Sequence, residues 1–145
     1  MDKNKLDIKK DIISLGALVA LKRANNLLEK NEIPIKKETG LTMGQFAVLE
    51  ILYSKGDLVI AEIIEGVLST SGNITVVIKN LKRDGYIIQI ANPNDKRSSL
   101  ISLTNKGIEI IERILPKHFE NITNSFSELT RDEKNFLIKL LRKIK

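Results

Sequence analysis

The sequence of 145 residues contains no cysteine and only one histidine, His118. Without cysteine the protein has no disulfide, no thiolate metal site and no cysteine-based redox switch. A single histidine with no carboxylate at ligand spacing is more often structural than metal-binding. Glycine-rich phosphate loops and nucleophile motifs are also missing from the sequence. We therefore expect no catalytic residues, no metal and no cofactor, and we expect that the protein is not an enzyme.

Long apolar runs are missing as well. No stretch of the sequence approaches the length of about 18 apolar residues that can span a membrane. The N-terminus alternates lysine and aspartate, unlike the apolar segment of a signal peptide. The composition, with 42% hydrophobic and 29% charged residues, is that of an ordinary globular protein. We expect one soluble, cytoplasmic domain with no membrane partner.

Basic residues outnumber acidic ones, with a formal net charge of +6. Residues 79–97 hold five basic and two acidic side chains, and residues 131–145 hold six basic and two acidic ones. The basic excess is therefore divided between two regions. It permits binding to nucleic acid, but it does not identify the binding surface.

The most informative pattern lies between residues 59 and 103. Apolar spacing predicts a packing helix over Val59–Val67, with Ile64 on its buried face. A second helix is predicted over Ser71–Asp84, with Thr70 as its hydroxyl cap and Gly85 closing it. The two helices have the order and length of a helix-turn-helix motif.

The second helix is amphipathic. Ile74, Val77, Ile78 and Leu81 recur at helical spacing and should be buried. The rest of the helix carries small, amide, hydroxyl and cationic groups, which match base edges and phosphates in a major groove. The alternative is a solvated polar face that contains little acid. The candidate DNA-binding residues on this helix are Ser71, Gly72, Asn73, Thr75, Val76, Lys79 and Arg83.

A two-stranded ribbon is predicted after this helix, over Tyr86–Ala91 and Ser98–Leu103. Its tip carries Asp95, Lys96 and Arg97. In an extended segment, residues two apart share a face, so the Asp95 carboxylate could hold the Arg97 guanidinium and aim it. An arginine aimed in this way suits a narrow minor groove. The alternative is a solvated hairpin whose charges have no role.

These residues carry a resemblance to a known family. The sequences at residues 68–75, 81–85, 92–97 and 103–107 resemble the MarR family of bacterial transcriptional regulators, and so does the stretch 41–46. The resemblance covers nearly the whole chain. It implies a winged helix-turn-helix homodimer that binds double-stranded, palindromic operator DNA and is often released by a small, often aromatic ligand.

Two positions depart from the family pattern. Val59 stands where a hydroxyl helix cap is common, which leaves Asp57 as the alternative cap. Gln89 stands on the first ribbon strand, where an arginine is frequent. Neither position belongs to the candidate recognition helix or to the tip of the ribbon.

The remaining chain is predicted to be helical. A first helix is expected over Leu6–Glu29, followed by a loop that continues to Gly40. Thr42 with Gln45, and Thr130 with Glu133, form capping boxes at the start of two later helices. The first of these helices should bury Phe46, Leu49 and Tyr53. Between the two boxes, Thr104 caps a long helix that Pro116 should kink or divide.

Both terminal regions combine broad apolar faces with helical periodicity. We expect a mainly α fold with a small β-wing, in which residues 1–145 form a single MarR-like domain. Residues 41–104 are the winged helix-turn-helix region, and residues 6–32 and 105–145 are dimerisation helices. The alternative is a monomeric bundle that buries these faces internally.

The sequence as a whole predicts a dimeric, sequence-specific DNA-binding transcriptional regulator. From the resemblance, we expect a repressor that a small-molecule ligand releases from its operator. The alternative is a winged-helix module that binds a protein without reading DNA sequence. The sequence assigns no residue to a ligand pocket.

Overall fold

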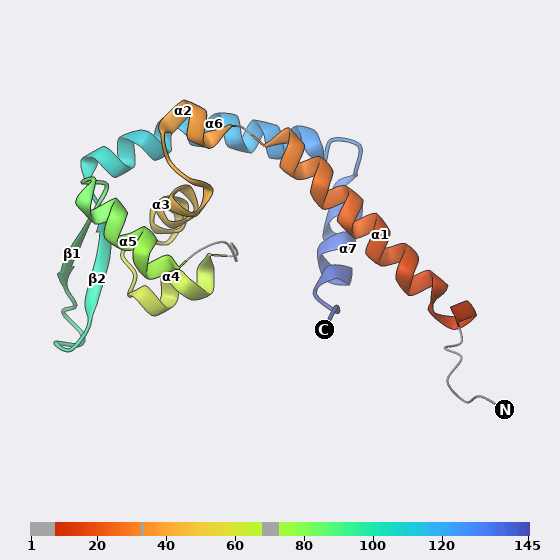
Figure 1. Ribbon diagram of the computed structural model, residues 1–145, viewed down its shortest axis with the longest axis horizontal. Helices are drawn as coiled ribbons and strands as arrows, with labels where there is room; N and C mark the ends of the chain where they lie inside the picture. Colours follow the sequence, from red (N-terminus) through yellow and green to blue (C-terminus); the bar gives the residue numbers. More distant parts are fainter. Residues whose placement is uncertain (1–7, 33, 68–72) are drawn as a thin grey trace. The chain divides into compact units, whose positions relative to one another are not determined.

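The computed structural model describes residues 8–32, 34–67 and 73–145 (Figure 1). These described residues form seven helices and one antiparallel two-stranded sheet. The helices and strands are α1 (Ile8–Asn31), α2 (Ile35–Thr39), α3 (Met43–Lys55), α4 (Ile60–Gly66), α5 (Ile74–Arg83), β1 (Ile87–Ala91), β2 (Ser99–Leu103), α6 (Asn105–Ser125) and α7 (Arg131–Leu141). Among these helices, none is both long enough and apolar enough to cross a membrane. The expected mainly α fold with a small β-wing is confirmed.

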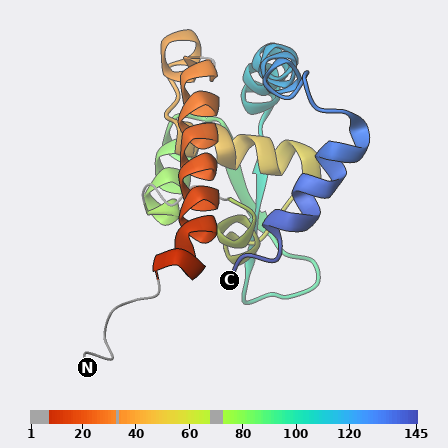
Figure 2. The same cartoon turned by 90° about the vertical axis from the view of Figure 1, so that its right-hand side faces the viewer.

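The chain forms two compact units. Residues 33–119 form what we call the winged-helix unit, and residues 1–32 with 120–145 form the terminal unit. In the winged-helix unit α3 packs against α4, α5 and β2, and α5 packs against β1. The β1–β2 hairpin projects from these helices as a ribbon (Figures 1 and 2). The arrangement is that of a winged helix.

The apolar core lies in the winged-helix unit. Its largest fully buried side chains include Phe46 and Leu49 of α3 and Leu81 of α5. The buried core residues are Ile35, Leu41, Phe46, Val48, Leu49, Ile51, Leu52, Ile63, Val67, Ile78, Leu81, Ile87, Ile101, Ile111, Ile114 and Leu115. In contrast, none of the described side chains of residues 12–32 and 120–145 is buried. The terminal unit therefore presents its apolar side chains to its surroundings.

Three predicted helix caps are confirmed. The Thr42 hydroxyl accepts a hydrogen bond from the Gln45 amide at 3.1 Å, and the Gln45 side chain accepts one from the Thr42 amide at 2.9 Å. The same reciprocal pair at the start of α7 joins Thr130 and Glu133. At the start of α6, the Thr104 hydroxyl accepts from the Gly107 amide at 3.1 Å. Each cap satisfies amides that have no partner within the helix.

The structure differs from other expectations about the helices. The segment before Gly40 is not a loop, because residues 35–39 form α2, which Gly40 closes with a φ of 76°. α1 continues to Asn31 rather than ending at Glu29. Of the two outcomes expected at Pro116, a kink or a division, the structure excludes division, since α6 continues through it to Ser125. These differences lie at helix ends and at a proline. At such positions the local sequence alone does not determine where a helix begins or ends.

The start of α4 also differs from the prediction. Neither a hydroxyl nor Asp57 caps it, and the Glu62 carboxylate accepts from the Val59 amide at 2.9 Å instead. Ile63 is fully buried, but Ile64 is 50% exposed and lies at the edge of the apolar stripe. Tyr53 of α3 is likewise more exposed than predicted, at 42%. The spacing of apolar residues identified the buried faces of α3 and α4 correctly. It also assigned Tyr53 and Ile64 to these faces, although both side chains are exposed.

The turn between α5 and β1 is held against the start of α6. Gly85 closes α5 with a φ of 79°, a backbone conformation that favours glycine. The Thr104 hydroxyl donates to the Gly85 carbonyl at 2.6 Å, and the Thr104 amide donates to the Tyr86 carbonyl at 3.1 Å. A Cβ atom at Gly107 would lie 2.2 Å from the Tyr86 carbonyl oxygen. Glycine at position 107 thus allows α6 to approach the turn closely.

Gly107→Ala should destabilise the winged-helix unit by about 1 to 3 kcal/mol, because the added methyl group overlaps a backbone atom that cannot move freely. Urea unfolding followed by circular dichroism measures this change. Glu109→Ala, at an exposed position on the same helix, should change the free energy of unfolding by less than about 0.5 kcal/mol. Equal unfolding midpoints for both variants would contradict the close approach.

Candidate nucleic-acid interface

The described part of the recognition helix begins at Ile74 rather than at Ser71. Asn73 caps it, because its Oδ1 atom accepts a hydrogen bond from the Thr75 amide at 3.0 Å. Asn73 is one of the candidate DNA-binding residues, and its side-chain oxygen also has this capping role in the fold. The predicted cap Thr70 and the candidates Ser71 and Gly72 lie outside the described residues.

The two faces of α5 are divided as predicted. Ile78 and Leu81 are buried, and Ile74 and Val77 pack partly buried against the same core. The outer face exposes Thr75, Val76, Lys79 and Arg83, and half of the Val76 surface is accessible. An apolar group at the surface of a polar helix can contact a thymine methyl. The structure therefore brings hydroxyl, methyl and ammonium groups together on one accessible face.

Arg83, at the end of α5, is paired with the next residue. Its Nε and Nη2 atoms donate to the two carboxylate oxygens of Asp84 at 2.8 and 3.2 Å. The hydrogen bond from Arg83 lowers the pKa of Asp84, and the same contact raises the pKa of Arg83. The arginine predicted to meet phosphate or guanine thus has a carboxylate partner within the protein.

The base of the wing is firmly joined to the winged-helix unit. Ile87 of β1 pairs with Leu103 of β2, and both Ile87 and Ile101 are buried. Leu58, before α4, exchanges two backbone hydrogen bonds with Ile101, at 2.8 and 3.2 Å. The segment before α4 thus forms a single antiparallel bridge with β2. This pairing fixes the direction in which the hairpin projects.

Two consecutive turns build the tip of the wing. The Asn92 side chain accepts from the Asn94 amide at 3.0 Å and donates to the Ser98 hydroxyl at 2.9 Å. The Asp95 carboxylate accepts from the Arg97 amide at 2.9 Å. Asparagine and aspartate favour turns because their side chains can bond to a backbone amide two residues on.

The predicted contact between Asp95 and the Arg97 guanidinium is wrong. Among the ion pairs of the described residues, none joins these two side chains, and the carboxylate holds the Arg97 backbone instead. The prediction assumed an extended segment, whereas Lys96 and Arg97 lie in a turn. Asp95 therefore shapes the turn that presents Lys96 and Arg97, whose side chains are both exposed.

Two lysines outside the predicted set connect neighbouring elements of the winged-helix unit. Lys82 of α5 donates to the Gln89 side chain of β1, with 3.1 Å between Nζ and Oε1. Lys106, at the start of α6, donates to the Asp84 carbonyl at 2.7 Å and lies 4.4 Å above the centre of the Tyr86 ring. No local pattern revealed the Lys82 contact, because it joins two secondary-structure elements. Lys106 belongs to the family-like stretch 103–107, which could have drawn attention to it.

The single histidine lies inside the winged-helix unit. The rings of His118 and Phe46 meet edge to face with 5.2 Å between their centres, and His118 Nε2 is 3.8 Å from Glu50 Oε1. Among the residues that the structure describes, no three histidines or carboxylates gather in a way that could hold a metal ion. The surroundings of His118 are those of a packed side chain.

The fold and the exposed helix define a class of protein, the winged helix-turn-helix regulators. Residues 30–114 match the family model described as transcriptional regulator SarA/Rot. A Bacillus subtilis protein named uncharacterized HTH-type transcriptional regulator YkoM is 40% identical over 121 residues, which cover 83% of this chain and 79% of that protein. The chain therefore belongs to the SarA/Rot family of MarR-like transcriptional regulators, and the resemblance to the MarR family is confirmed.

Solved structures agree with this assignment. One is a cysteine-to-serine mutant of MarR from E. coli complexed with operator DNA, with 27% identity and a TM-score of 0.70 over 95% of this chain and 98% of that chain. Another is BpsR of Bordetella bronchiseptica, described with regulation of DNA binding by 6-hydroxynicotinic acid. It has 26% identity and a TM-score of 0.67 over 90% of this chain and 97% of that chain.

Replacing Arg83 with glutamine should raise the pKa of Asp84 toward its ordinary value, because the hydrogen bond and the positive charge that favour the carboxylate are removed. The pair stabilises the fold at pH values above the pKa of Asp84 in the unfolded chain, and this contribution is lost as the pH falls through the lowered value in the fold. A carbon-detected NMR titration of the side-chain carboxyl measures this change. Lys79→Gln removes an equal charge one turn away and should leave the titration nearly unchanged, so identical shifts in both variants would contradict the pairing.

Proposed function

We propose that the protein is a homodimeric repressor that binds double-stranded operator DNA and is released from it by a small-molecule ligand. The observation that carries this proposal is the exposed face of α5, which combines Thr75, Val76 and Lys79 beside a projecting wing. The function is one of binding rather than catalysis, as in the family of regulators to which the chain belongs. Repression requires only that the occupied operator excludes other proteins from the same DNA.

In this proposal α5 enters the major groove. Its exposed hydroxyl and ammonium groups meet base edges and phosphates, and Val76 meets a thymine methyl. The buried opposite face of the helix leaves only this side accessible. The operator-bound structure of E. coli MarR supports the same use of the fold here.

The wing contacts the flanking minor groove. Lys96 and Arg97 stand at its tip, and the negative potential of a narrow minor groove attracts such cations. Asp95 contributes by holding the turn through the Arg97 amide. The contacts of Thr104 and Lys106 with the α5–β1 turn keep the helix and the wing in a fixed relation.

The dimer forms through the terminal unit. The terminal unit exposes more apolar side chains than the surface of a soluble monomer usually does. A second copy would cover these side chains through a two-fold interface. A dimer also places two recognition helices at half-sites about 34 Å apart. The large exposed apolar residues of this unit are Ile12, Ile13, Leu15, Leu18, Val19, Leu21, Leu27, Ile122, Phe136, Ile138, Leu140, Leu141 and Ile144.

Release by a ligand requires a site that a small molecule can enter. The BpsR relative, whose DNA binding is regulated by 6-hydroxynicotinic acid, supports this part of the proposal. The winged-helix unit contains a cavity of about 500 Å³ bordered by α3, α4 and α6. A ligand there would bear directly on α3, which packs against the recognition helix.

Arg97→Ala and Lys79→Ala should each weaken operator binding by about 1 to 3 kcal/mol, because each removes a groove or phosphate contact. Fluorescence anisotropy measures this loss, with the DNA upstream of the protein's own gene beside a scrambled duplex of equal length. Lys37→Ala removes an equal charge from α2 and serves as the control. Near-normal affinity in both test variants would indicate a winged-helix module that binds a protein instead.

Phe136→Glu should shift the protein from dimer toward monomer, because a charge placed in an apolar interface has no water and no partner. Phe136 is 58% exposed in the single chain. Sedimentation equilibrium measures the change. Asn135→Glu adds the same charge at the neighbouring exposed position and should affect the dimer less, whereas an unchanged dimer in Phe136→Glu would exclude this face from the interface.

A further inference from the structure

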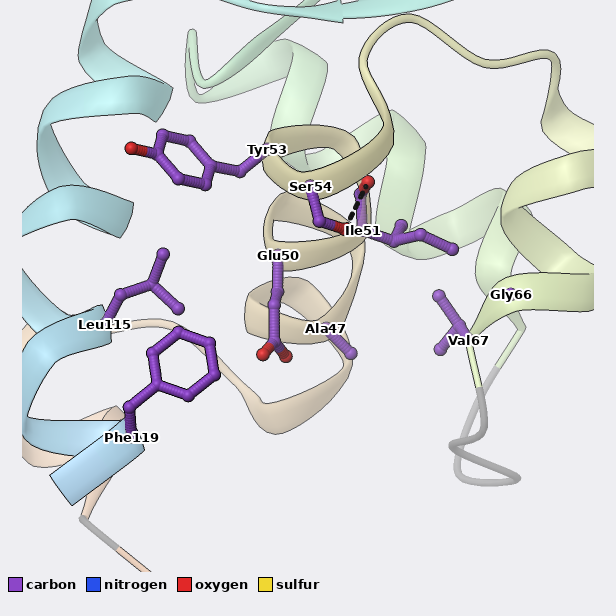
Figure 3. A pocket seen from close by; sticks show the side chains of 9 residues that line it. All are labelled: Ala47, Glu50, Ile51, Tyr53, Ser54, Gly66, Val67, Leu115 and Phe119. Carbon is purple, nitrogen blue, oxygen red and sulfur yellow. Dashed lines mark hydrogen bonds between the residues drawn. The ribbon is translucent and has the colours of Figure 1, made fainter. Parts of the chain in front are cut away.

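The cavity in the winged-helix unit has apolar walls. Leu115 and Phe119 of α6 lie on one side of the Glu50 side chain, and Val67 lies on the other (Figure 3). The volume of about 500 Å³ is within the range of small-molecule sites. The apolar side chains that line it are Ala47, Ile51, Val67, Leu115 and Phe119.

The two hydroxyl groups that line the cavity, of Tyr53 and Ser54, already donate hydrogen bonds within the protein. The Tyr53 hydroxyl donates to Glu112 at 3.0 Å. The Ser54 hydroxyl donates to the Ile51 carbonyl at 3.2 Å (Figure 3). The hydrogen bond to Glu112 also raises the pKa of Tyr53. Both hydroxyl oxygens remain able to accept a hydrogen bond from a ligand.

The charge in the cavity is negative. Glu50 lines it, and Glu112 stands behind Tyr53. Of the described residues that border the cavity, none is a lysine or an arginine. His118 Nε2 is 3.8 Å from Glu50 Oε1, which is beyond hydrogen-bond distance. The Glu50 carboxylate, whose side chain is 35% exposed, is therefore available as an acceptor.

We propose that this cavity binds an aromatic cation, such as a protonated aromatic amine, and discriminates against aromatic carboxylates. Glu50 holds the ammonium group, and the ring lies among Val67, Leu115 and Phe119. An aromatic anion of the same size would place its carboxylate beside Glu50, where the described lining residues include no lysine or arginine to compensate it. This inference rests on the proposed regulation by a ligand and names the chemical class of that ligand.

The experiment uses the full-length protein without DNA and two ligands of similar shape and opposite charge. These are 1-naphthylmethylamine, a cation at neutral pH, and 1-naphthoate, an anion. Isothermal titration calorimetry measures both affinities. The amine should bind about tenfold or more tightly than the carboxylate, because one charge is attracted by Glu50 and the other is repelled.

Glu50→Gln should reduce this preference to less than about threefold, because the amide keeps the shape of the side chain but not its charge. Glu109→Gln, the same change at an exposed position on α6, should leave the preference intact. Unfolding midpoints confirm that both variants are folded. Equal binding of the two compounds to the unmodified protein, preference for the carboxylate, or no binding of either would overturn the inference.

Operator affinity is measured separately, with and without the amine. Amine binding with no operator binding would leave the ligand class standing and contradict the proposed function. Operator binding with no preference for the amine would support the proposed DNA-binding function and contradict the proposed ligand class. The two failures are therefore distinguishable.

Discussion

The hydrogen bonds between the start of α6 and the α5–β1 turn are the constraint on which the reading surface depends. Thr104 holds Gly85 and Tyr86, and Lys106 holds the Asp84 carbonyl. These contacts join the end of α5 and the beginning of the wing to α6. Because all the accepting atoms are backbone carbonyls of the turn, the connection does not involve the α5 and wing-tip side chains that would meet DNA.

The features predicted correctly from the sequence are local ones. The caps at Thr42, Thr104 and Thr130 and the buried face of α5 follow from residue types a few positions apart. The Lys82–Gln89 contact joins separate elements, so its partners are not evident before the fold is known. The Asp95 prediction failed because the tip is turned rather than extended. The cavity escaped prediction because three helices and a following residue contribute to it.

Opposite charges are separated within the winged-helix unit. The exposed cations of α5 and of the wing suit a polyanion, whereas the cavity beside α3 has the Glu50 carboxylate and no lysine or arginine among its described residues. In the proposed function, one site binds DNA and the other binds a small molecule, and this separation of charge suits two such different ligands. Coupling between the two sites would pass through α3, which packs against α5 and lines the cavity.

The central claim is that the exposed face of α5 and the wing read a DNA sequence. A salt titration of binding to the DNA upstream of the protein's own gene, beside a scrambled duplex of equal length, tests it most directly. We predict tight binding to the upstream DNA that is preferred at every salt concentration and weakens steeply as salt increases, because phosphate contacts release counterions. Equal, weak binding to both duplexes would contradict sequence reading. It would mean that the basic surface attracts nucleic acid without regard to sequence.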